Sequence, residues 1–259
     1  MIVVGIPYFI HSRMIWMSDC FPIVVDIETA NLGPGKPGQK VNPNDWEIAC
    51  IGVFDSLSKE RYVFIPFDKI NRYEGCPEVN SYLFNDLQSS LLKATTADYV
   101  LPLTQFLHSL NHWASTGRYF LTHRGHNFDW PILSHHLGFP FLYDNLNLKG
   151  RLLDTHAYIE QQTGHNCGLN ALITACLGES EEKILKGKDA PRIWQQGIAE
   201  YQQNFRLENL ALVIDYCLGD VVKTYGVFSY GLENDSIEVV PYGVESTVSV
   251  PITSWGVNL

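Results

Sequence analysis

The sequence predicts an α/β fold in which a mixed central sheet is flanked by helices. Three strand-like segments come first, near residues 23–29, 46–55 and 62–67, and turn-forming residues separate them. Segments with helical spacing then alternate with short strand-like segments. A strand meander followed by alternating helices and strands is typical of a single sheet covered by helices.

The first half of the chain supplies the meander. It begins with the apolar run 23–25, Ile-Val-Val, whose β-branched side chains favour a strand. The Gly- and Pro-rich stretch 31–44 indicates an exposed loop. The strands at 46–55 and 62–67 then complete an antiparallel meander. Residues 71–94 are mixed in character, so we expect an insertion there that contains some helix.

The second half supplies most of the helices. Apolar residues at Leu103, Phe106, Leu110 and Trp113 have helical spacing and predict a helix over 98–115. The remaining predicted elements are a strand at 118–122, a helix at 128–137 with Pro131 in its first turn, a strand at 151–154, and helices at 169–177, 191–203 and 207–225.

Length and composition indicate a soluble globular protein of one main domain. The chain has 259 residues, of which 46% are hydrophobic and 18% charged, which argues against disorder as its main state. We expect the domain to span residues 18–230, and residues 231–259 to form a C-terminal extension that is either loose or an edge hairpin. Residues 1–16 are either a true N-terminus, forming an extra edge strand, or the result of a start codon placed too early.

Cysteine usage and hydropathy favour a cytoplasmic protein. No apolar run reaches the ~18 residues of a membrane span, and the apolar first residues lack the basic leading region of a secretory signal. The cysteines form no Cys-x-x-Cys pair, so we expect them to be reduced and mostly buried. They are Cys20, Cys50, Cys76, Cys167, Cys176 and Cys217.

The net charge of −10 opposes loose electrostatic binding to a polyanion and argues against a general nucleic-acid coating protein. It does not exclude a nuclease. Two bound divalent ions would add 4 positive charges and bring −10 to −6, with the positive charge concentrated at a scissile phosphate.

Four acidic residues in three separated segments suggest where such ions would bind. Asp26 and Glu28 follow the first strand run at i, i+2 spacing, which places both side chains on one face of that strand. Asp129 lies at the start of the helix predicted over 128–137, and Asp220 lies in the long helix predicted over 207–225. Magnesium prefers carboxylate oxygens, so this set is chemically suited to Mg²⁺.

A tyrosine accompanies the last acidic residue. Tyr216 and Asp220 are four residues apart on the predicted helix and therefore share a face. If Asp220 joins Asp26 and Glu28 on one ion, and Asp26 bridges to a second, the result is a two-metal phosphodiester site with ions about 3.5 to 4 Å apart. Tyr216 would stay neutral at pH 7 and orient the attacking water.

These segments resemble the three motifs of the DEDD superfamily of 3′–5′ exonucleases, in the subgroup with Tyr-x-x-x-Asp in the last motif. Within that group, the Leu-Leu-Asp-Thr segment at 152–155 and the helix start at 168–172 resemble the exonuclease domain of family B DNA polymerases, and the stretch around Trp194 and Gly197 resembles stand-alone relatives of that domain. The resemblance implies a ribonuclease H-like fold. It also implies metal ligands at Asp26, Glu28, Asp129 and Asp220, a water-orienting Tyr216, and two Mg²⁺ or Mn²⁺ ions.

The implied activity is removal of nucleoside 5′-monophosphates from the 3′ end of single-stranded nucleic acid, with DNA favoured. An RNA exonuclease and a catalytically silent, nuclease-like binding module are the alternatives. A polymerase or repair protein on a separate chain is a possible partner. Thr29 either ends its strand or contacts the terminal nucleotide, and Asn127 either caps its helix or contacts substrate. Phe128 is a core or substrate-binding residue.

Several other clusters have both a structural and a functional interpretation. His108 and His112 either lie on a helix surface or ligate zinc. The stretch His123, Arg124 and His126 could contact phosphate. Basic residues near 183–192 form either a solvated loop or a clamp for single-stranded substrate, with Trp130 and Trp194 as candidate stacking partners. The cluster consists of Lys183, Lys186, Lys188 and Arg192.

Overall fold

The computed structural model describes residues 21–31, 42–70, 77–138, 151–178, 185–243 and 246–252. Its centre is a mixed sheet of six strands in the order β4-β3-β2-β1-β5-β6. Strands β1, β2 and β3 pair antiparallel, whereas the β3–β4, β1–β5 and β5–β6 pairs are parallel. The strands are β1 (Ile23–Thr29), β2 (Ile48–Asp55), β3 (Glu60–Ile65), β4 (Tyr99–Pro102), β5 (Phe120–Thr122) and β6 (Leu152–Asp154).

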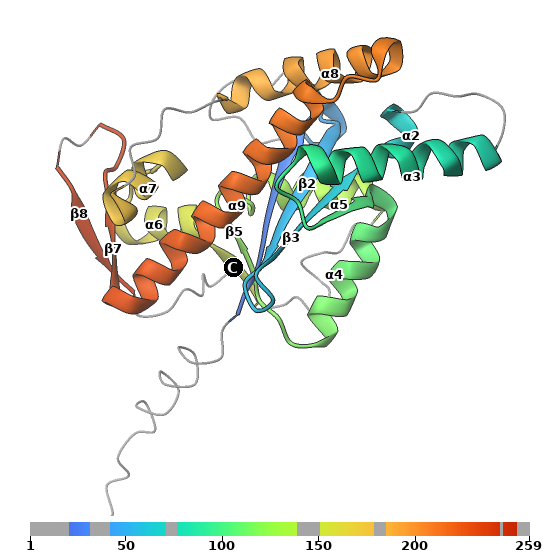
Figure 1. Cartoon of the computed structure of the whole chain (residues 1–259). Coiled ribbons are helices and arrows are strands. Elements are labelled where there is room, and N and C mark those ends of the chain that lie inside the picture. The colour runs from blue at the N-terminus through green and yellow to red at the C-terminus, as the bar shows by residue number, and fades with distance from the viewer. Residues whose placement is uncertain are drawn as a thin grey trace, which may run out of the picture.

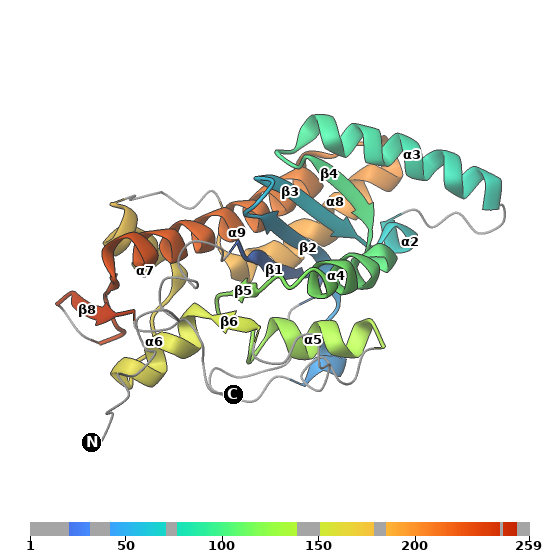
Figure 2. The same cartoon turned by 90° about the horizontal axis from the view of Figure 1, so that it is seen from below.

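Helices cover both faces of this sheet. The long helix α9 crosses one face diagonally, and α8 lies on the same side (Figure 1). Helices α4 and α5 lie on the opposite side (Figure 2). The helices are α2 (Phe67–Ile70), α3 (Pro77–Ala94), α4 (Phe106–Ser115), α5 (Asp129–His136), α6 (Thr155–Thr163), α7 (Leu169–Leu177), α8 (Ala190–Asn204) and α9 (Glu208–Asn234), with short 3₁₀ turns η1 (Pro43–Asp45), η2 (Leu103–Gln105) and η3 (Gly187–Asp189).

Strand β1 separates two cores because its side chains alternate between the faces of the sheet. Ile23, Val25 and Ile27 belong to the core under α4 and α5, whereas Val24 belongs to the core under α9. The same period of two places Asp26 and Glu28 on the α9 face, in line with Val24. The two acidic residues of the first motif are therefore directed at the helix that carries the third.

The fold class predicted from the sequence is confirmed, and so is the antiparallel meander. The helix predicted over 169–177 has the predicted bounds, and Pro131 lies in the first turn of α5. Two predictions need correction, and one helix was not predicted. Residues 99–102 form β4 rather than the start of a helix, and residues 155–163 form the unpredicted helix α6. The last long helix continues to Asn234, nine residues beyond the predicted end.

The C-terminal part described by the structure is ordered into a small sheet. Strands β7 (Ser236–Val239) and β8 (Val248–Pro251) pair antiparallel with each other and not with the six-stranded sheet. Strand β7 packs against α7 and α9, with Ile237 and Val239 fully buried. The hairpin alternative is therefore correct in its pairing, although the hairpin does not lie at an edge of the main sheet. The domain boundary at residue 230 stays a prediction.

Other expectations concern cysteines, membrane spans and chain ends. The four cysteines that the structure describes are free thiols and buried: Cys50, Cys167, Cys176 and Cys217. In the described part of the chain, no helix combines the length and apolar character that crossing a membrane requires. Residues 1–16, Cys20, Cys76, Lys183 and most of the Gly- and Pro-rich loop lie outside the described residues.

Candidate metal centre

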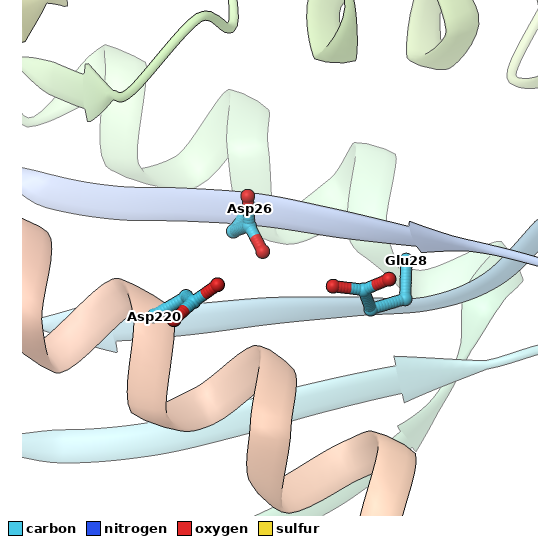
Figure 3. Close-up of side chains that lie close together, drawn as sticks. All are labelled: Asp26, Glu28 and Asp220. Atoms are coloured by element: carbon cyan, nitrogen blue, oxygen red, sulfur yellow. The ribbon is translucent and has the colours of Figure 1, made fainter. Parts of the chain in front are cut away.

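Three carboxylates from two elements meet on the α9 face of the sheet. Asp26 and Glu28 extend from β1, and Asp220 extends from α9 toward them (Figure 3). One carboxylate oxygen from each residue lies within 4.8 Å of the others. An ion held there would have oxygen ligands only, which suits Mg²⁺ or Mn²⁺ rather than a metal that prefers sulfur. The register of the β1–β2 pair shifts between Glu28 and Thr29, at the end of the strand that carries the two acidic residues.

Burial and mutual repulsion make this cluster electrostatically costly without a cation. Burial is the main cause that raises the pKa of Glu28 well above its ordinary value, and the negative charge of Asp26 is the next. Asp220 and Asp129 raise it further. A divalent cation would reverse these effects, because it favours the ionised form of every carboxylate that contacts it. The chemistry of the residues therefore fits a divalent metal.

Asp129 lies beside the group of three but is not part of it. It is the first residue of α5 and its side chain is only 3% exposed. Burial first, and then the charges of Asp26 and Asp154, raise the pKa of Asp129 well above its ordinary value, while Arg124 acts in the opposite direction. Asp129 is thus close enough to Asp26 and Glu28 for their charges to interact.

Tyr216 faces the same cluster. It is one turn before Asp220 on α9, and the Asp220 carboxylate is near enough to act on its hydroxyl. Burial, followed by the charges of Asp220, Glu28 and Asp26, raises the pKa of Tyr216 far above its ordinary value of 10.0. The hydroxyl therefore stays protonated at neutral pH and can donate a hydrogen bond. The shared helix face predicted from the i, i+4 spacing is confirmed.

Sequence reasoning missed how closely α9 approaches the sheet. A Cβ atom at Gly52 would lie 2.8 Å from the Sγ atom of Cys217 and 3.3 Å from the carbonyl carbon of the same residue. Gly52 is opposite Asp26 in the β1–β2 register. A glycine inside a strand marks close approach of another backbone, and this was the signal available in the sequence.

The residues expected to contact substrate have different surroundings. Thr29 ends β1 and is buried. Asn127 is exposed and does not cap α5, because Phe128 occupies the N-cap position and no side chain caps that end. The capping prediction for Asn127 is therefore wrong. Phe128 is partly buried, and its ring meets that of Trp46 edge-to-face at 5.0 Å. The contacts of these residues with substrate stay predictions.

The remaining candidates are two tryptophans and two histidines. Trp130 and Trp194 are each 1% exposed, which makes them core residues and excludes them as stacking partners. His108 and His112 are exposed on α4, and neither belongs to a candidate metal group among the residues described.

The basic cluster borders the metal centre. Lys186 and Lys188 are exposed and flank Gly187, and a Cβ atom at Gly187 would lie 3.4 Å from the Tyr216 hydroxyl. The backbone at Gly187 therefore lies beside the Tyr216 hydroxyl, with an exposed lysine on each side of Gly187 in the sequence.

Comparisons with known proteins agree with this architecture. A family model described as the RNase_H superfamily matches residues 81–230, a range that contains Asp129, Tyr216 and Asp220. A solved structure of the family B DNA polymerase from the hyperthermophilic archaeon Pyrobaculum calidifontis superimposes with a TM-score of 0.51 and 16% sequence identity. The match covers 82% of this chain and 24% of the polymerase, so the likeness is one of fold. A search of curated protein sequences finds no match.

Proposed function

Because the chain belongs to the RNase H superfamily, we propose that it is a metal-dependent 3′–5′ exonuclease acting on single-stranded nucleic acid. One observation carries the proposal. Asp26, Glu28 and Asp220 converge within 4.8 Å, and the Tyr216 hydroxyl lies close enough to them for their charges to help keep it protonated. A structural acidic cluster has no need of a protonated phenol beside it, whereas a hydrolytic site needs a group that orients water.

Each side chain would have a distinct task. Asp26, Glu28 and Asp220 would hold one divalent ion, and Asp26 with Asp129 would hold a second. When bound, the two ions activate the attacking water and neutralise charge on the phosphate and the leaving 3′ oxygen. Tyr216, kept protonated by its surroundings, would fix the position of that water. Its proton need not leave, because metal coordination lowers the pKa of the water instead.

The test is cleavage of a 5′-labelled single-stranded oligonucleotide. We expect a ladder of shortened products with Mg²⁺ or Mn²⁺, and none with a chelator or with Asp26→Ala. Asp68→Ala is the matched control, because it removes an exposed carboxylate from α2. An intact substrate with both metals and folded wild-type protein would overturn the proposal.

The polymer and the partner are separate questions. The two-metal chemistry is the same for DNA and RNA, and discrimination depends on contacts to the 2′ hydroxyl. Matched DNA and RNA oligonucleotides distinguish the two, and we expect faster cleavage of DNA. Calorimetric titration with Mg²⁺ or Mn²⁺ tests the alternative of a silent binding module, which predicts no heat of metal binding. A polymerase or repair protein as partner stays a prediction.

A further inference from the structure

Asp154, which is outside the predicted metal ligands, makes an unusual set of hydrogen bonds. Its carboxylate is 4% exposed and accepts hydrogen bonds from four backbone N–H groups. Two come from His156 at 2.9 Å and Ala157 at 3.1 Å, in the first turn of α6. The other two come from Arg124 at 3.0 Å and His126 at 2.8 Å, which are about 30 residues earlier in the chain.

The two pairs of hydrogen bonds have different meanings. The bonds to His156 and Ala157 make Asp154 the N-cap of α6, which is a common role for aspartate. The bonds to Arg124 and His126 have no such local explanation. They join the end of β6 to the turn between β5 and α5, which we call the β5–α5 turn (residues 123–128). The Oδ1 atom accepts the hydrogen bonds from His156, Ala157 and Arg124, and the Oδ2 atom accepts the one from His126.

The β5–α5 turn has a conformation that needs support. Arg124 has a φ of 71°, in the left-handed region that residues other than glycine rarely adopt. Gly125 is pressed against the preceding strand end, because a Cβ atom there would lie 2.3 Å from the Oγ1 atom of Thr122. Strained backbone of this kind persists where surrounding structure fixes it, and it gathers at functional sites.

The β5–α5 turn also fixes the start of α5. The carbonyl oxygen of Gly125 accepts hydrogen bonds from the N–H groups of Phe128 at 3.3 Å and Trp130 at 2.9 Å. Asp129 lies between these two donors, so its backbone position follows from the shape of the turn. Its side chain can face Asp26 only while that shape is kept.

We propose that Asp154 is a positioning residue that holds Asp129 in the metal centre by clamping the β5–α5 turn. The inference rests on the proposed nuclease function for its catalytic consequence, although the clamp itself can be measured without catalysis. Among the residues described, Asp154 is outside the group of carboxylates that could share a metal ion, and both of its oxygens accept hydrogen bonds from backbone N–H groups.

Two substitutions separate the clamp from the cap. Asp154→Ser keeps a short oxygen that can cap α6, since serine and aspartate are similarly good N-cap residues, but it cannot reach the turn. Asp154→Asn keeps one carbonyl oxygen in the place of Oδ1 and sets an amide N–H group against the N–H of His126. The control is Asp55→Asn. The Oδ1 atom of Asp55 accepts from the backbone N–H groups of Leu57 and Ser58, and the carboxylate also forms an ion pair with Arg118, at the end of β2 remote from the site.

Hydrogen exchange and steady-state kinetics together test the clamp. For Asp154→Ser we expect faster amide exchange at residues 126–130 and a kcat at least about tenfold lower, with KM little changed, since small misplacements of reacting groups can cost up to about a hundredfold in rate. Asp154→Asn should lie between Ser and wild type in both readouts. Asp55→Asn should leave kcat within about twofold, even if it lowers the melting temperature.

Each outcome of these two experiments either supports or overturns the proposed clamp. Unchanged exchange at residues 126–130 in Asp154→Ser overturns the clamp, whatever the kinetics. Faster exchange with wild-type kcat shows that Asp154 holds the turn without positioning Asp129, and so also overturns the proposal. If wild-type protein cleaves no substrate, the proposed function fails, and the exchange data for the first turn of α5 still decide whether Asp154 orders Asp129.

Discussion

The thiol of Cys217 lies 3.6 Å from the backbone carbonyl oxygen of Asp26 and 3.7 Å from its Oδ2 atom. This contact joins α9 to β1 at the point where the two helical residues of the candidate site, Tyr216 and Asp220, face the two strand residues. It is possible because Gly52, on the neighbouring strand, has no side chain between them. The distance between the third motif and the first is therefore set by small residues rather than by the acidic residues themselves.

Gly52→Ala should displace α9 and impair the site. The added Cβ would meet the Cys217 sulfur at 2.8 Å, and Cys217 is fully buried, so the helix must move by several tenths of an ångström. We expect a loss of about 1 to 3 kcal/mol in the free energy of unfolding, which is typical of overpacking. We also expect activity to fall by roughly tenfold or more. Denaturant titration and the oligonucleotide assay measure the two effects.

Cys217→Ala is the matched second change. In the Gly52→Ala background it removes the sulfur that the new methyl group meets, so the double variant should be more stable than Gly52→Ala alone. The backbone carbon of Cys217 would still lie 3.3 Å from the new atom, so recovery should be partial. Additive effects of the two substitutions would contradict steric coupling between these positions.

The sequence predicted the elements that depend on local pattern and missed those that depend on contact between distant segments. The 169–177 helix is predictable because Gly168 and Gly178 bound its apolar run, and Gly178 ends it in a left-handed conformation. By contrast, β4 is only four residues long and runs directly into η2 and α4, so its apolar residues merge with the helical pattern.

The same distinction applies to the candidate site. Asp26 and Glu28 lie on the same face of β1 because side chains alternate along a strand. Tyr216 and Asp220 lie on the same face of α9 because residues four apart in a helix are neighbours. No sequence periodicity predicts the hydrogen bonds from the N–H groups of Arg124 and His126 to Asp154, because these bonds join segments at the ends of two different strands, β5 and β6. Helix α6 itself was recognisable in principle, since Asp154 caps its start and Gly164 ends it with a φ of 72°.

Glu28→Gln should stabilise the metal-free protein at neutral pH. Burial raises the pKa of Glu28 in the folded state, so the folded protein binds more protons than the unfolded chain above the ordinary value of 4.5. Stability therefore falls as the pH rises from about 4.5 toward the raised pKa. Asp129 acts in the same direction. The neutral amide removes the Glu28 contribution, because it resembles the protonated acid.

Calorimetric melting in the presence of a chelator, between pH 5 and 8, measures this effect. The melting temperature of Glu28→Gln should exceed that of wild type by a margin that widens with pH. Saturating Mg²⁺ should stabilise wild type more than the variant, because the variant has lost a ligand. A variant that is less stable than wild type at pH 8 without metal would contradict the electrostatic account.

Tyr216→Phe should lower kcat by about 10- to 100-fold, at or below the lower end of what a positioned catalytic group contributes. It removes only the hydroxyl, which is not a proposed metal ligand, so metal affinity should stay close to that of wild type. The raised pKa of Tyr216 also predicts that the wild-type rate shows no loss from tyrosine ionisation up to pH 9. Stopped assays across that range, with calorimetry for the metal, provide the measurements.

Tyr225→Phe is the control for that experiment. Tyr225 lies on the same helix, and its hydroxyl accepts a hydrogen bond from Nζ of Lys59 at 3.2 Å, away from the carboxylates. Its removal should leave kcat unchanged. Equal losses in the two variants would indicate a general effect on α9 rather than a role for Tyr216 in orienting water.

Lys186 and Lys188 should contribute to substrate binding and not to the chemical step. They flank the Gly187 backbone that approaches Tyr216, and α8, which follows them, is fastened to the end of β1 by a 2.8 Å hydrogen bond from Gln195 to the Ala30 carbonyl oxygen. On a chain with a net charge of −10, local cations of this kind are needed to attract a polyanion to the site.

The double variant Lys186→Ala and Lys188→Ala should therefore raise KM with kcat nearly unchanged. If each lysine neutralises one phosphate of a single strand, the slope of log affinity against log salt should weaken by about 0.7 per lysine, or about 1.4 in total. Lys93→Ala, which removes an exposed lysine from the last turn of α3, is the control for net charge. The same change in slope per lysine for Lys93→Ala, about 0.7, would show that overall charge, rather than the position beside Tyr216, governs binding. A fall in kcat without a rise in KM would place the two lysines in the chemical step instead.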